Sequence, residues 1–399
     1  MSAVMTLVQL ANRVDVDQLV GTKPSNRWGR ASLTTPRADG YSIAGWFETH
    51  PAKERIDLVR EALVNGTPWA PLLRARLPKT PPSTETRAVD MPVVLDQARI
   101  YILNDWLAAY AETVLTRVAV AFRRGTRMSN VIMNAHRRMK RLPFASVIDI
   151  ASFFDSIPWT VAEGAVEKLL ADGNVKAFLK SLIHVQVVES RSGNLVKRVR
   201  GIPQGLSCSP VIANLVLREF DEEVAHALSR TGVTVRRYCD DILIQGPSLA
   251  ATRQAVTIIG RRLAKLGLSV KAGTGHLVDT RMEPFTWLGI AFGPDGLRVP
   301  PDVTKRKVVE LQGRFNFGNM SIEGVEASLI SLSNYYERTV GPGEAMAMVS
   351  SIRTGLDLPN SRYVTRKEDI HHLRHLTGNR SHRGSPPIAA DGNSRTMER

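Results

Sequence analysis

Apolar residues recur at helical spacing in several stretches of the chain, and these stretches predict the main helices. The longest, from Ile100 to Phe122, contains neither Pro nor Gly, so we expect one continuous helix there. A smaller helical unit is expected from Thr304 to about Leu356. The remaining predicted helices span 56–64, 161–170, 211–228 and 252–266.

Short apolar or alternating runs between these helices predict β-strands. One buried run, Ser146–Ile150, carries a carboxylate at its end, and two others flank the turn Ser192–Asn194 as in a hairpin. The segment from Leu77 to Val94 contains four prolines, which predicts short extended pieces joined by turns. The predicted strands span 146–150, 185–188, 195–199, 233–237, 242–245, 268–271 and 286–292.

The net charge of the chain indicates which class of partner it binds. Among 399 residues, 53 Lys and Arg stand against 38 Asp and Glu, a net charge of +15. Such an excess favours polyanions, nucleic acid above all, although membrane-surface proteins share it. No stretch approaches the roughly 18 apolar residues that cross a bilayer, and no signal-peptide pattern opens the chain, so a cytoplasmic protein without a membrane partner is expected. The two cysteines, Cys208 and Cys239, are expected to be small buried residues.

Acidic residues stand at two points where isolated carboxylates are costly to bury. Asp149 ends a buried apolar run, and Asp240-Asp241 occupies a turn between two strand-like runs. Taken alone, Asp149 could cap a helix and the Asp pair could be an ordinary polar turn. If the three converge, they offer the oxygen ligands that Mg²⁺ prefers, and two ions about 3.5–4 Å apart could activate a hydroxyl and stabilise a leaving pyrophosphate.

Three strings occur in order along the chain: VIDIASFFDSIP, GIPQGLSCSPVIANLVL and RRYCDDILIQG. They resemble motifs A, B and C of the reverse-transcriptase family, and the resemblance covers roughly residues 61–336. It implies an RNA-templated DNA polymerase with an α+β right-hand fold, in which a palm with an antiparallel sheet carries the acids. The implied parts are an N-terminal extension (1–55), fingers (56–145), palm (146–299), helical thumb (300–358) and a basic flexible tail (359–399).

The resemblance also implies roles for single residues. Two Mg²⁺ ions would be held by Asp149, Asp240 and Asp241 together with the backbone carbonyl of Ile150. The nucleotide pocket would be formed by five further residues, of which Lys79 and Arg87 hold the triphosphate of the incoming dNTP. Phe154 would exclude the 2′-hydroxyl of a ribonucleotide, whereas Phe153 faces the other way. Gln204 and Gly205 would line the nucleotide and template pocket.

Later motifs fit the family less uniformly. The family often has a Lys in motif D that protonates the leaving pyrophosphate; the matching place here holds Thr274, with Lys271 three positions earlier and His276 two later. Either of these two could serve as the general acid. Trp287-Leu288-Gly289 resembles the primer grip, and the aromatics of 331–336 are expected in the thumb core.

The subtype is inferred by elimination. About 40 residues follow the thumb, which argues against an endonuclease, integrase or RNase H module there. Pro203-Gln204-Gly205 differs from diversity-generating enzymes, and the retron elements are missing. The chain is therefore most similar to stand-alone bacterial reverse transcriptases, including the second type of defence-associated enzyme. That similarity implies a structured non-coding RNA template, a DNA product paired to it as an RNA–DNA hybrid, and a role in antiphage defence.

Two alternatives stay open. A maturase-like RNA-binding protein could share this fold without polymerising, although it would not need three convergent acids. A protein-primed polymerase that works without a template is also compatible with the motifs. Nothing in the sequence indicates the oligomeric state.

Overall fold

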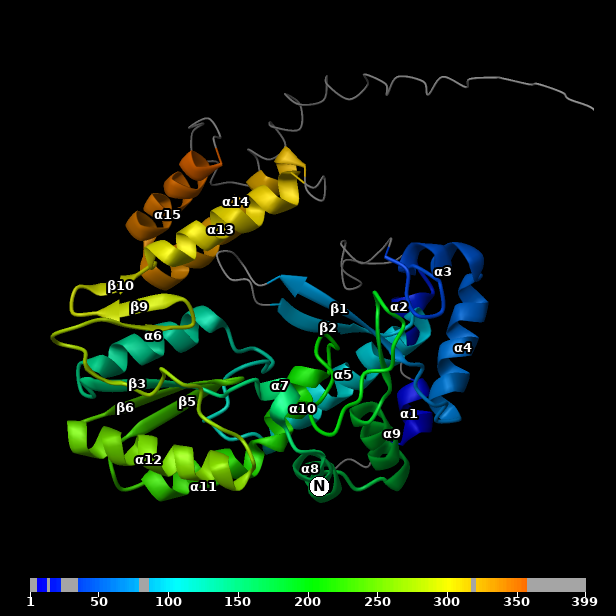
Figure 1. The fold of residues 1–399 in the computed structure, drawn as a ribbon, viewed down its shortest axis with the longest axis horizontal. Coiled ribbons are helices and arrows are strands. Elements are labelled where there is room, and N and C mark those ends of the chain that lie inside the picture. The colour runs from blue at the N-terminus through cyan, green and yellow to red at the C-terminus, as the bar shows by residue number, and fades with distance from the viewer. Residues whose placement is uncertain (1–5, 13–14, 23–34, 79–85, 317–320, 357–399) are drawn as a thin grey trace, which may run out of the picture.

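The computed structural model describes residues 6–12, 15–22, 35–78, 86–316 and 321–356, and it combines helices with three small sheets (Figure 1). This is the predicted α+β class. The helices are α1 (Leu7–Ala11), α2 (Asp15–Val20), α3 (Ile43–Thr49), α4 (Ala52–Val64), α5 (Val94–Val114), α6 (Met128–Met139), α7 (Phe153–Ser156), α8 (Trp159–Leu169), α9 (Gly173–Ile183), α10 (Ser209–Val216), α11 (Arg218–Leu228), α12 (Leu249–Lys265), α13 (Pro301–Asn316), α14 (Ile322–Val340) and α15 (Pro342–Gly355). The strands are β1 (Leu72–Pro78), β2 (Thr86–Met91), β3 (Phe144–Asp149), β4 (Val187–Glu189), β5 (Thr234–Tyr238), β6 (Asp241–Gly246), β7 (Leu277–Asp279), β8 (Phe285–Trp287), β9 (Ile290–Gly293) and β10 (Gly296–Arg298).

The central sheet is antiparallel, with its strands in the order β5-β6-β3-β7. Because side chains alternate along a strand, β6 sends Ile242 and Ile244 into one buried cluster and Leu243 into another. Helices α11 and α12 cover the first face, and α6 lies on the opposite face beside the β8–β9 hairpin (Figure 1). Both faces are therefore buried, which explains the apolar runs of β3 and β6.

A second sheet, in the order β2-β1-β4, lies next to α5 and the N-terminal helices (Figure 1). Strands β1 and β2 are antiparallel, and β4 joins β1 in parallel. The first helices belong to the same core, since α1 and α2 pack on α4 and the Arg55 side chain donates from Nε to the Val20 carbonyl at 2.6 Å. The predicted N-terminal extension is thus packed against the rest of the chain where it is described.

Helices α13–α15 form the helical unit predicted after Thr304. They share the second buried cluster with α6 and with the β8–β9 hairpin. Tyr336 is buried in this cluster, and the hydroxyl of its neighbour Tyr335 lies 3.0 Å from the sulfur of Met128 at the start of α6. The expectation that these aromatics fill a core is confirmed.

Several predicted boundaries were wrong. The helix expected at 100–122 is α5, which begins at Val94 and ends at Val114, because the chain then turns extended and adds to the edge of β5, with the Val120 amide donating to the Arg237 carbonyl at 2.9 Å. The helix expected at 211–228 is divided at Leu217 into α10 and α11.

Three predicted strands differ as well. The segment 268–271 makes only a single bridge, and so does 195–199. The segment expected to be one strand, 286–292, forms the hairpin β8–β9 instead. Its loop has two residues, Leu288 and Gly289, which both have positive φ and reverse the chain. The unpredicted helices are α1, α2, α3, α6, α7 and α9. The predicted tail at 359–399 lies outside the described residues, and the predicted domain boundaries stay predictions.

Candidate active site

Pairing between β3 and β6 brings the predicted acids to one end of the central sheet. Asp149, the last residue of β3, stands directly opposite Asp241, the first residue of β6. The amide of Ile150 donates to the carbonyl of Asp240 at 3.0 Å. Asp149 and the Asp240-Asp241 pair, about ninety positions apart in the chain, therefore lie side by side at the ends of the central strands β3 and β6, as the sequence predicted.

The turn that carries Asp240 has a costly backbone conformation. Cys239 has a φ of 61°, in the region that favours glycine, and so holds the first position of the β5–β6 turn where Gly is usual. Ser152, three residues after Asp149, has a φ of 45°. Conformations of this kind cost on the order of 1–3 kcal/mol and concentrate at functional sites.

A buried ion pair under the turn holds it in place. The Arg237 guanidinium forms a two-point pair with Asp221 of α11, at 2.6 and 2.9 Å, and both side chains are fully buried. It also donates to the Cys239 carbonyl and to Oδ1 of Asn214, each at 3.0 Å. Burial, opposed by Arg237, raises the pKa of Asp221. This network was not predicted from the sequence, although Arg237 directly precedes Tyr238 and Asn214 lies within the second motif.

Lys271 lies at the carboxylates. Its Nζ is 2.6 Å from Oδ2 of Asp149, and its backbone amide donates to the Asp149 carbonyl at 2.8 Å. Thr274 Oγ1 accepts from the Asp149 amide at 3.3 Å. Of the two residues that could serve as general acid, the structure thus brings Lys271 to the acids.

The acids repel one another in the absence of a cation. Burial, together with the charges of Asp149 and Asp240, raises the pKa of Asp241 to about 7. Burial and the charge of Asp149 also raise the pKa of Asp240. A divalent cation would relieve this repulsion, and carboxylate oxygens suit Mg²⁺.

The carboxylates are not yet arranged as a complete set of metal ligands. Among the residues that the structure describes, no three His, Cys, Asp or Glu side chains are placed to hold a metal ion as they stand. Asp149 is paired with Lys271 instead. The donor types fit Mg²⁺, but Asp149 would have to exchange its ammonium partner for the ion.

Of the five residues predicted to form the nucleotide pocket, four lie within the described residues. Phe153 is buried at 2% exposure, while Phe154 is only half-buried, so the two rings point differently, as predicted. Gln204 donates from Nε2 to Asp155 at 2.9 Å. Arg87 lies exposed on β2, paired in register with Leu77. Lys79 lies outside the described residues.

Gly205 lies where its backbone comes so close to that of β2 that a side chain would not fit. Its φ is +100°, and a Cβ there would lie 2.9 Å from a methyl carbon of Val89 and 3.1 Å from the Asp90 carbonyl oxygen. Asp90 exchanges two hydrogen bonds with the Gln204 backbone, at 2.6 and 3.0 Å, and forms a buried two-point pair with Arg74. The second motif is thereby fastened to β2. Asp90 and Arg74 were not singled out from the sequence.

Several other residues singled out from the sequence are buried. Trp287 is buried at 1% exposure in the cluster shared with α13–α15. Cys208 and Cys239 are both buried, as predicted, and burial is the main cause that raises the pKa of each thiol to about 12.

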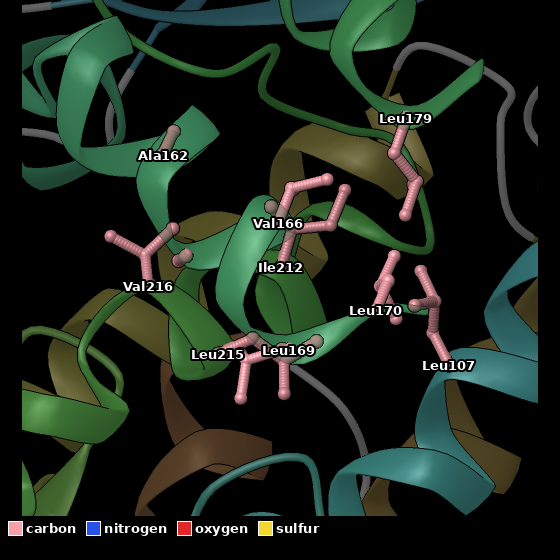
Figure 2. Close-up of a pocket in the computed structure, with 10 residues that line it drawn as sticks. Leu107, Ala162, Val166, Leu169, Leu170, Leu179, Ile212, Leu215 and Val216 are labelled. Atoms are coloured by element: carbon pink, nitrogen blue, oxygen red, sulfur yellow. The ribbon is translucent and has the colours of Figure 1, made fainter. Parts of the chain in front are cut away.

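The cavity in Figure 2 is a separate feature. It lies between α5, α8, α9 and α10, and every side chain that lines it is aliphatic. A nucleotide triphosphate requires cations, so this cavity does not suit one. Within the described residues, no helix is both long and apolar enough to cross a bilayer.

Comparison with known proteins identifies the family. The family model "Reverse transcriptase (RNA-dependent DNA polymerase)" matches residues 77–292, more than half of the chain. The chain therefore belongs to the reverse-transcriptase family, and this membership, with the α+β arrangement above, confirms the predicted right-hand polymerase fold.

Individual relatives are distant. Retron Ec73 reverse transcriptase of Escherichia coli is 23% identical over 188 residues, which are 44% of this chain and 55% of that protein. The chain thus spans about half the length of this curated relative. The predicted exclusion of the retron group is not decided by this likeness and stays a prediction.

Two solved telomerases are similar at low identity. The apo telomerase of Candida tropicalis, truncated from its C-terminal domain, is 12% identical, with a TM-score of 0.47 over 58% of this chain and 56% of that one. The telomerase of Candida albicans in complex with the TWJ fragment of telomeric RNA is 14% identical, with a TM-score of 0.47 over 78% of this chain and 67% of that one.

Proposed function

We propose that the chain is an RNA-directed DNA polymerase that joins deoxynucleotides on an RNA template at Asp149, Asp240 and Asp241. One observation carries this proposal: the register between β3 and β6 sets Asp149 opposite Asp241, next to a turn held in a strained conformation. A pure RNA-binding protein gains nothing from acids that repel one another at the ends of two central strands. The family membership names the reaction.

Two Mg²⁺ ions would be held by the three carboxylates and the Ile150 carbonyl. When bound, the ions supply charge stabilisation for the attacking and leaving oxygens of the phosphoryl transfer. The chain itself places the carboxylates, through the Asp221–Arg237 pair and the β3–β6 ladder. Lys271, already at Asp149, is the group placed to give a proton to the leaving pyrophosphate.

The nucleotide would lie between these carboxylates and β2. Arg87 is exposed on β2 and can pair with phosphate oxygens, and Lys79 is proposed to act with it. Gln204 and Gly205 lie where the second motif meets β2. The half-buried ring of Phe154 is proposed to exclude a ribose 2′-hydroxyl.

Primer extension tests the proposal. The purified chain is mixed with a 5′-labelled DNA primer on an RNA template, Mg²⁺ and either four dNTPs or four NTPs. Extension to the template end with dNTPs, and little with NTPs, is expected. A chain that binds the duplex but adds no nucleotide would contradict the proposal. DNA attached to a Tyr or Ser of the chain, formed without primer or template, would support the protein-primed alternative instead.

We further propose that the template is a structured non-coding RNA copied during antiphage defence. The support is the pattern Pro203-Gln204-Gly205 and the missing retron elements, which leave the stand-alone bacterial enzymes as the best match. Deep sequencing of DNA from cells that carry the locus should reveal complementary DNA to a neighbouring RNA. No such DNA, with or without phage, would count against this role.

A further inference from the structure

The segment between Glu112 and Asp149 is unusual in its charge. It contains eight Lys and Arg residues and no Asp or Glu. The segment includes α6, which lies on the central sheet on the side opposite α11 and α12 (Figure 1). Arg137 and Arg138 lie in the last turn of α6, and Lys140 and Arg141 follow it directly.

Six cations from this region and the neighbouring sheet edge form what we call the α6 basic strip. Its members are Arg117, Arg137, Arg138, Lys140, Arg141 and Arg236. Four of them, Arg117, Arg137, Lys140 and Arg141, are exposed. Across the described part of the chain, none of the six forms an ion pair, whereas nearby Arg123 is paired with Glu112 at 3.0 Å.

The cations of the strip come from three parts of the chain. Arg236 lies on the edge strand β5, and Arg138 is in the last turn of α6. Arg117 precedes the segment that bonds to β5, in which the Val118 carbonyl accepts from the Arg237 amide at 2.7 Å. Burial, and then the charges of Arg138 and Arg117, lowers the pKa of Arg236 to about 10. Arg138 and Arg117 thus act on Arg236 as like charges.

Helix-end stabilisation explains only part of this arrangement. Arg137 and Arg138 interact favourably with the C-terminal dipole of α6. Arg117 and Arg236 come from other elements and gain nothing from that dipole. An anion with several negative groups would satisfy all of them at once.

The end of the strip that follows α6 is separate from the acids. Arg141 lies three residues before β3 begins, whereas Asp149 is its last residue. A strand of this length spans about 17 Å. Arg141 therefore lies at the far end of the sheet from the proposed catalytic carboxylates, whereas Arg236, which pairs in register with Leu243, is nearer to them.

We infer that the α6 basic strip is a second nucleic-acid contact, which binds the phosphate backbone of a helical segment of RNA outside the polymerase site. The α6 sequence contains no Phe, Tyr or Trp, so it offers no platform on which unpaired bases could stack. Guanidinium and ammonium groups alone suit a regular backbone, read by charge and shape. The choice of RNA rests on the proposed function, in which this chain copies an RNA.

A matched pair of triple variants tests the inference. Arg137→Gln/Lys140→Gln/Arg141→Gln removes three exposed charges from the strip. Arg253→Gln/Arg261→Gln/Lys265→Gln removes three exposed charges from α12, on the other side of the sheet. Both variants have the same net charge, so a difference between them reports position rather than total charge.

Binding is measured by fluorescence anisotropy with the full chain and a dumbbell RNA helix, closed by a loop at each end, which has no 3′ end to offer to the carboxylates. At about 0.15 M salt the strip variant should bind at least about tenfold more weakly, with a slope of log K against log salt that is smaller by about 2–3. The α12 variant should bind within about twofold of the wild type. The inference would be overturned if the two variants bound the dumbbell RNA equally, whether both matched the wild type or both lost the same affinity.

Two controls separate this inference from the proposed function. Melting temperatures show whether each variant folds, and residues this exposed should change stability by less than about 0.5 kcal/mol. Wild-type primer extension is measured on a separate short duplex. If extension fails while the strip variant still loses dumbbell binding, the proposed function is wrong and the second contact stands; the reverse result overturns the contact alone.

Discussion

The ammonium nitrogen of Lys271 lies 2.6 Å from Oδ2 of Asp149, so a proposed metal ligand is paired with a cation of the chain itself. The pair is partly open to solvent, with 59% of the Lys271 side chain and 26% of the Asp149 side chain exposed. A pair of this kind is weak, on the order of 0–1 kcal/mol, and can be exchanged for an ion.

Replacing Lys271 with Met should strengthen divalent-cation binding, because Asp149 no longer has to give up a partner. We expect Mn²⁺ to bind about two- to fivefold more tightly, as measured by electron paramagnetic resonance. Lys265→Met, an exposed change on α12, should leave Mn²⁺ binding unchanged. Weaker Mn²⁺ binding by the Lys271 variant would show that the lysine helps to build the ion site rather than competing with it.

Metal binding should also depend on pH. Burial and neighbouring acids raise the pKa of Asp241 to about 7, far above its usual value near 4, so below pH 7 an incoming Mg²⁺ ion has to displace a proton. Without metal, the folded chain holds this proton more tightly than the unfolded chain, so the contribution of Asp241 to stability is lost as the pH rises from about 4 to about 7. Added Mg²⁺ should therefore raise the melting temperature more at pH 8 than at pH 6.

The comparison uses thermal unfolding with EDTA and with Mg²⁺ at each pH. Asp241→Asn cannot titrate and should show a small Mg²⁺ effect that is equal at the two pH values. A Mg²⁺ effect in the wild type that is larger at pH 6 would contradict the assignment of Asp241.

The buried pair between Asp221 and Arg237 should show strong coupling. Changing Arg237 alone to Leu leaves a buried carboxylate without its partner and should lower the free energy of unfolding by about 3–5 kcal/mol. Changing both residues to Leu should cost less than that single change. Urea unfolding of the two single variants and the double variant measures the coupling. Additive losses would mean that the pair does not hold the β5–β6 turn.

Phe154 and Phe153 offer a matched test of sugar selection. Phe154→Ala should lower the preference for dNTPs over NTPs by about 10- to 100-fold, because the half-buried ring no longer blocks the 2′-hydroxyl. Phe153→Leu changes the buried ring and should alter stability without altering this preference. Single-nucleotide incorporation kinetics decide the matter, and an unchanged preference in the Phe154 variant would remove its proposed role.

The acidic residues of the site could be predicted because each stands out from the residues next to it in the sequence. Asp149 ends an apolar run, and Asp240-Asp241 lies between two β-type runs. The strand ends and the turn can therefore be predicted from the spacing of apolar residues alone. What brings them together, the antiparallel register of β3 with β6, was implied by the family resemblance rather than by periodicity.

The supporting residues could not be predicted in the same way. Arg237 bonds to Asp221, and Arg74 to Asp90, both sixteen positions away, and such pairs depend on tertiary packing. The end of α5 was missed for a similar reason. Its apolar pattern continues past Val114, but the chain gains more by adding to the edge of β5 than by extending the helix.

The most direct test of the proposed catalytic site is the rate of Mg²⁺-dependent primer extension on RNA by Asp240→Asn beside Asp295→Asn, an exposed acid with 75% of its side chain in solvent. We expect the Asp240 variant to fold and bind the primer–template but to extend it at least about a thousandfold more slowly, a loss of about 4 kcal/mol in transition-state stabilisation. The Asp295 variant should match the wild type. An Asp240→Asn protein that extends the primer at the wild-type rate would contradict catalysis at these carboxylates.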